Sequence, residues 1–150
     1  QYFDGCHAAA CTVLSRQLET LISTNGIHCD DLWQHALIEN GVVIDIFENI
    51  PDYFADPDED VRDRREKYRG NSKAIARACG VEPAVVAHYL VHLTRNGSEG
   101  KAFPDDECTL GEPWIFRDFW RRLGIHIPAS EERAVRLQLP QDFMEKLPSM

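Results

Sequence analysis

The stretch Val42-Val43-Ile44-Asp45-Ile46-Phe47 is the part of the sequence on which the class of fold depends. Its β-branched and aromatic composition is typical of a strand, but across 42–54 the apolar side chains also recur at helical spacing. Periodicity alone leaves both structures open. We interpret 42–54 as a helix, because the segments before and after it have helical patterns.

On the N-terminal side, apolar residues at helical spacing predict a helix over 6–24 that ends at Asn25-Gly26. A second helix is expected from Asp30 or Asp31, as its N-cap, to Asn40-Gly41. Helices therefore lie next to the ambiguous stretch in this interpretation.

On the C-terminal side, the acidic run 56–60 predicts a helix over 57–69 with Asp56 as N-cap. It does not match a calcium loop, because Val61 stands where that loop needs glycine. Further expected elements are two helices within 72–95, a flexible loop over 96–111, an aromatic helix from Pro113 to Gly124, and a strand and helical turn within 132–147.

Together these elements predict a mainly α fold, close to the all-alpha class. We expect a compact multi-helix single domain over 1–150, with minor β-structure near the C-terminus. The chain has 150 residues, a formal net charge of -9 and five cysteines. The odd cysteine count without a CxxC pair favours a reducing, cytoplasmic location. No apolar run is long enough to cross a membrane, and the overall acidity excludes a generally basic nucleic-acid binder.

One segment carries a recognisable pattern. A small residue, Ala76, is followed by Gly80 four residues later and by the apolar Val81. Val86, and Tyr89 or Leu90, then supply the bulky side chains that would pack a second helix against the first. Residues 72–91 thus resemble a helix-turn-helix, in which the second helix enters the major groove of duplex DNA and the first crosses the backbone.

The resemblance implies contacts to nucleic acid from specific positions. Lys73 and Arg77 would lie near phosphates, and base edges would be contacted from the second helix by Ala84, Val85, His88 and Arg95. The charge distribution agrees with this interpretation. Residues 62–101 carry a net charge of +5 and the remainder of the chain carries -14.

Two other groups of residues are candidate metal or catalytic sites. His88 and His92 stand four residues apart on a predicted helix, at the spacing of a zinc pair, but the sequence supplies no third ligand. A site with a thiol and an imidazole forms only if the fold brings cysteine and histidine side chains together. The candidates are Cys6, His7 and Cys11, or His28, Cys29 and His35. We therefore expect no cofactor and no metal.

The leading hypothesis is a small regulatory protein that binds duplex DNA through 62–101, as a homodimer if it reads a palindrome. A first alternative is a protein-interaction module whose acidic remainder binds a basic protein partner. A second alternative is a small enzyme that depends on the cysteine and histidine residues. An enzyme is less expected than a binding protein, because no catalytic motif is present.

Overall fold

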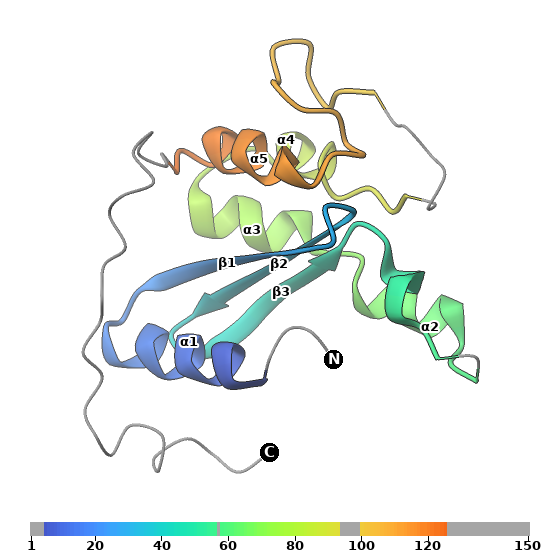
Figure 1. Ribbon diagram of the computed structural model, residues 1–150. Coiled ribbons are helices and arrows are strands. Elements are labelled where there is room, and N and C mark those ends of the chain that lie inside the picture. Colours follow the sequence, from blue (N-terminus) through green and yellow to red (C-terminus); the bar gives the residue numbers. More distant parts are fainter. Residues whose placement is uncertain (1–4, 57, 94–99, 126–150) are drawn as a thin grey trace.

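The centre of the protein is a three-stranded antiparallel sheet (Figure 1). The computed structural model describes residues 5–56, 58–93 and 100–125. The strands are β1 (Leu21–His28), β2 (Leu32–Glu39) and β3 (Val42–Glu48), paired in the order β1-β2-β3. The prediction of a mainly α fold is therefore wrong, since the N-terminal half contains a β-meander.

The turn between β2 and β3 explains one part of the error. Asn40 and Gly41 have φ values of 50° and 76°, and Glu39 pairs directly with Val42, so the two residues form a tight hairpin turn. Such turns favour Asn-Gly, because both central residues must adopt positive φ and these two residue types tolerate it. The same dipeptide also ends helices, so the sequence alone predicts a helix that ends at Asn40-Gly41.

Burial explains the rest. Every residue from Leu32 to Ile38 is buried, because helices cover both faces of β2. A strand covered on both faces loses the alternation of apolar and polar residues that normally reveals it. The helix predicted from Asp30 or Asp31 to Asn40 is thus β2, and the one predicted over 42–54 is β3 followed by the short 3₁₀ helix η1 (Pro51–Phe54).

Helices flank the sheet on both sides (Figure 1). On one face lies α1 (Gly5–Gln17), which is shorter than predicted because Leu21 and Ile22 belong to β1. The other face is covered by α3 (Ser72–Cys79), α4 (Pro83–Ala87) and α5 (Phe116–Arg122), the last preceded by η2 (Pro113–Ile115). No described helix is long and apolar enough to span a membrane.

The exposed helix α2 (Val61–Lys67) lies beside the end of the sheet and contains no buried residue. Its N-cap is Asp60, whose side chain accepts a hydrogen bond from the backbone N–H of Arg62, rather than the predicted Asp56. The strand and turn expected within 132–147 lie outside the described residues.

The main core joins the sheet to α3, α4 and α5. Trp33, Leu37 and Phe47 of the sheet pack with Ile75, Val86 and Phe119 of the helices. The Phe119 ring lies 5.4 Å from that of Trp33 and 5.5 Å from that of Tyr89, so Phe119 connects two halves of this core. The aromatic segment 113–124 therefore contributes to stability mainly through packing.

Two buried carboxylates attach the irregular segment 100–112 to this core. Asp106 accepts hydrogen bonds from the Tyr89 hydroxyl at 2.8 Å and from the backbone N–H of Phe103. Asp118 accepts from the backbone N–H groups of Glu107 and Cys108. Burial raises the pKa of Tyr89, so its hydroxyl remains a donor at neutral pH. The described part of the predicted flexible loop is thus tied to α5.

We expect Phe119→Ala to lower the free energy of unfolding by about 3–5 kcal/mol, because it leaves a cavity between Trp33 and Tyr89. The matched control is Trp114→Ala, since Trp114 is 50% exposed and should cost about 0.5 kcal/mol or less. Urea unfolding followed by tryptophan fluorescence and circular dichroism measures both. Equal losses for the two variants would contradict this account of the core.

Candidate functional site

A buried histidine and a buried aspartate form a hydrogen-bonded pair within the sheet. His35 of β2 and Asp45 of β3 have fully buried side chains, and His35 Nδ1 lies 3.1 Å from Asp45 Oδ2. Asp45 pairs with Leu37 in the strand register, so it is a diagonal neighbour of His35 on the same face of the sheet. Two adjacent antiparallel strands thus hold both side chains in one geometry.

Ser23 of β1 completes a chain of hydrogen bonds. Its Oγ lies 3.1 Å from His35 Nε2, and the indole N–H of Trp120 donates to the same oxygen at 2.9 Å. Ser23 pairs with Leu37 across β1 and β2, so it too is a diagonal neighbour of His35. The three strands therefore present Ser23, His35 and Asp45 side by side.

The donors and acceptors assign a direction to this chain. An ionised Asp45 only accepts, so His35 Nδ1 carries the proton that the carboxylate accepts. Trp120 occupies one acceptor site of Ser23, which leaves the Ser23 hydroxyl free to donate to His35 Nε2. The second oxygen of Asp45 accepts from the backbone N–H of Asn71, the N-cap residue of α3. Each member of the network thus has a fixed partner.

Aromatic rings exclude water from the imidazole. The Phe119 ring stands edge-on to His35 at 5.2 Å, and the Trp33 ring lies at 6.5 Å. Ser23 is partly exposed, whereas His35 and Asp45 are buried. A nucleophile in contact with a base that is held by a third group is the arrangement used for nucleophilic catalysis.

The cysteines are not arranged in this way. Burial raises the pKa of the Cys11, Cys79 and Cys108 thiols, which disfavours the reactive thiolate. Cys29 Sγ lies 3.2 Å from His28 Nε2 in the exposed turn after β1, away from His35. Cys6 and His7 belong to the first turn of α1, and their side chains are not among those described.

The helical hairpin has the packing expected from its sequence. Ala76 and Val86 are buried, Gly80 has a φ of 70°, and Tyr89 is 1% exposed. Lys73, Ala84 and His88 are exposed, and Val85 is half-buried. Arg77 forms an ion pair with Glu39 at 2.8 Å, and the His88 ring packs against Phe103 at 4.9 Å. Arg95 lies outside the described residues.

His88 and His92 do not share a helix face. The helix α4 ends at Ala87, because the chain turns there and the backbone N–H of Val91 bonds to the carbonyl of Tyr89. His92 stacks on Phe47 and its Nε2 lies 3.1 Å from the carbonyl oxygen of Tyr68. Among the described residues no group of three histidine, cysteine, aspartate or glutamate side chains is able to hold a metal ion.

Sequence reasoning named His35 only within a cysteine and histidine set and missed Ser23 and Asp45. The available signal was the strand composition of 42–47, which would have placed Asp45 beside β2.

In comparisons with protein-family models, curated proteins and solved structures, nothing matches this chain.

We expect Asp45→Ala to lower the free energy of unfolding by about 1–3 kcal/mol or more, because the buried imidazole of His35 and the part-buried backbone N–H of Asn71 lose their acceptor. The control, Glu39→Ala, removes a surface carboxylate paired with Arg77 and should cost about 1 kcal/mol or less. Chemical denaturation gives both values. Similar small losses would mean that the network contributes little to the fold.

Proposed function

We propose that this protein is a small enzyme that transfers or hydrolyses acyl groups by nucleophilic catalysis. Ser23 Oγ attacks the acyl carbon, His35 Nε2 accepts its proton and returns it to the leaving group, and Asp45 orients the imidazole. The observation that carries this proposal is the chain Ser23 Oγ to His35 Nε2 at 3.1 Å and His35 Nδ1 to Asp45 Oδ2 at 3.1 Å.

Two further features support the proposal. The assigned tautomer, with the proton on Nδ1, leaves Nε2 as the acceptor that a general base needs. Ser23 is the partly exposed member, so a substrate would approach the network through its hydroxyl. A cytoplasmic location, expected from the cysteine content, belongs to the same proposal.

In this proposal the nucleophile is the hydroxyl of Ser23, and not a cysteine thiol as in the enzyme alternative given from the sequence. Cys11, Cys79 and Cys108 have pKa values raised by burial, so they are poor nucleophiles. Cys6, which the sequence places beside His7, is the cysteine that the test must separate from Ser23.

A fluorophosphonate probe tests the nucleophile. We expect the full chain to be labelled on Ser23, as identified by mass spectrometry of its peptides. His35→Gln should reduce the labelling rate by about 10²-fold or more, because the general base is lost.

Ser72→Ala is the control for Ser23→Ala, since Ser72 lies at the start of α3 with no histidine bonded to it in the described structure. Ser23→Ala should abolish labelling while Ser72→Ala leaves it unchanged. Labelling of Cys6 by iodoacetamide that requires His35, with none of Ser23, would contradict the serine assignment. Thermal melts of each variant separate loss of chemistry from loss of fold.

Nucleic-acid binding through 62–101 remains a second proposal. It is supported by the packing of the α3 and α4 hairpin around Ala76, Gly80 and Val86, and by the exposed cation Lys73. Several other cations of the segment are engaged in ion pairs with carboxylates, so only weak binding is expected. Docking of a basic protein on the acidic remainder and formation of a homodimer stay predictions.

A salt titration with random duplex DNA tests the second proposal. We expect affinity to fall steeply between 50 and 200 mM salt, on the order of tenfold or more if a few phosphates are contacted. The double variant Lys73→Glu and Arg77→Glu should bind more weakly, and Glu19→Gln, far along the chain from α3, serves as its control. Absence of binding at low salt would remove this function.

A further inference from the structure

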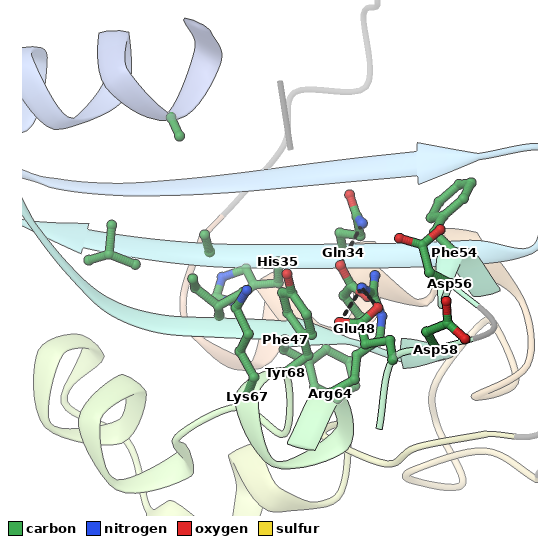
Figure 2. Close-up of a pocket in the computed structure, with 15 residues that line it drawn as sticks. Gln34, His35, Phe47, Glu48, Phe54, Asp56, Asp58, Arg64, Lys67 and Tyr68 are labelled. Atoms are coloured by element: carbon green, nitrogen blue, oxygen red, sulfur yellow. Dashed lines mark hydrogen bonds and ion pairs between the residues drawn. The ribbon is translucent and has the colours of Figure 1, made fainter. Parts of the chain in front are cut away.

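A cavity of about 1090 Å³ lies between the sheet, α1 and α2 (Figure 2). The strands β2 and β3 form its floor, and α2 forms a wall. The lining includes Gln34, His35 and Ala36 of β2, Ile46, Phe47 and Glu48 of β3, and Arg64, Lys67 and Tyr68 at and after α2. The volume is sufficient for a drug-sized ligand.

This cavity and the Ser23 network lie on opposite faces of β2, although His35 is among the residues that line the cavity. Successive side chains of a strand point to opposite faces, so Gln34 and Ala36 face the cavity while the His35 imidazole faces Phe119. A ligand in the cavity would therefore be separated from the His35 imidazole by the sheet.

Glu48 is a buried carboxylate at the floor of the cavity. Its side chain is 6% exposed, and among the described residues two side chains donate to it: Gln34 Nε2 at 2.9 Å and Arg64 Nη2 at 3.5 Å. An ionised carboxylate has about four acceptor positions, so positions of Glu48 stay unfilled by these partners. Burial raises the pKa of Glu48, although the charge of Arg64 opposes this.

Arg64 does not fully compensate Glu48, because its guanidinium is shared. Its Nε donates to the carbonyl oxygen of Pro51, and its Nη1 donates to Glu59 at 3.0 Å. Asp56, Asp58 and Glu59 also line the cavity, so four carboxylates there oppose the two cations Arg64 and Lys67. Asp56, Asp58 and Glu59 are exposed, so the lining as a whole, and not only its buried floor, favours positive charge over negative charge.

We propose that this cavity binds an organic cation with a guanidinium or primary ammonium group, which pairs with Glu48. The cation would donate to the acceptor positions of Glu48 that Gln34 and Arg64 leave open. Tyr68 and Phe54 line the same space, and the Tyr68 ring already interacts with cations, since Arg64 and Lys67 lie 5.0 and 4.9 Å from its centroid. The proposal does not depend on the chemistry of Ser23.

Butylguanidinium and butylurea form a matched pair of probes, since they have similar shape and differ in charge. In calorimetric titrations of the full chain at pH 7.5 and low salt, we expect butylguanidinium to bind at least about tenfold more tightly than butylurea. Equal affinity for the two probes, or no binding of either at millimolar concentration, would overturn the proposal.

Glu48→Gln keeps the shape of the side chain and removes its charge. It should lose the preference for butylguanidinium, whereas Glu82→Gln, an exposed residue that caps α4 outside the cavity, should keep it. Retention of the preference by Glu48→Gln, or tighter binding of acetate than of butylguanidinium by the natural chain, would also overturn the proposal.

The pH dependence gives a readout that does not require a ligand. The pKa of Glu48 is higher in the folded state than in the unfolded state, so the folded state binds the proton more tightly. The stability that this protonation contributes is therefore lost as the pH rises from the unfolded to the folded pKa. Relative to the natural chain, Glu48→Gln should gain stability between pH 4 and 7. The cations of α2 that face Glu48 are Arg64 and Lys67. An unchanged difference in stability would show that Glu48 is not a poorly compensated carboxylate and would overturn the proposal.

Discussion

The burial of β2 on both faces is the constraint on which the rest of the structure depends. Leu32 to Ile38 has no exposed residue, yet the strand contains the polar side chains of Gln34 and His35. A buried polar group is costly unless it is hydrogen-bonded, so each needs partners from a neighbouring strand. Gln34 bonds Glu48 on one face, and His35 bonds Ser23 and Asp45 on the other. Both candidate sites arise from this requirement.

The charge asymmetry along the chain has a structural counterpart within the molecule. Cations of the basic segment pair with carboxylates, several of them from the acidic part: Arg64 with Glu48 and Glu59, Arg65 with Asp52, Arg69 with Glu66, and Arg77 with Glu39. The exposed pairs among these, such as Arg69 with Glu66 and Arg77 with Glu39, contribute little stability, about 0–1 kcal/mol each. They nevertheless reduce the positive field that a phosphate backbone would meet. Ion pairs of Arg64, Arg65 and Arg77 thus join the basic segment to carboxylates of the acidic part.

Local signals succeeded where one element determines its own structure. The break at Gly80 was predictable because φ of 70° suits glycine, and the start at Pro113 because proline favours a first helical turn. They failed at 30–54, where apolar runs and Asn40-Gly41 fit two structures equally well. The Ser23, His35 and Asp45 site was missed for the same reason, since a helical interpretation of these segments provides no strand register to bring the three side chains together.

The sequence by itself determined the break at Gly80 between α3 and α4, the exposed character of α2 and the packing role of the aromatic helix. These depend on caps, glycine conformation and periodicity, which act within about twenty residues. The sequence did not determine the length of α4, which ends at Ala87 and not beyond His92 as predicted. The tertiary structure alone decided that 32–48 forms strands, because burial on both faces is a property of the packed layers. It also decided which polar residues meet, because strand register joins Ser23, His35 and Asp45 across gaps of 12 and 10 residues that no local pattern encodes.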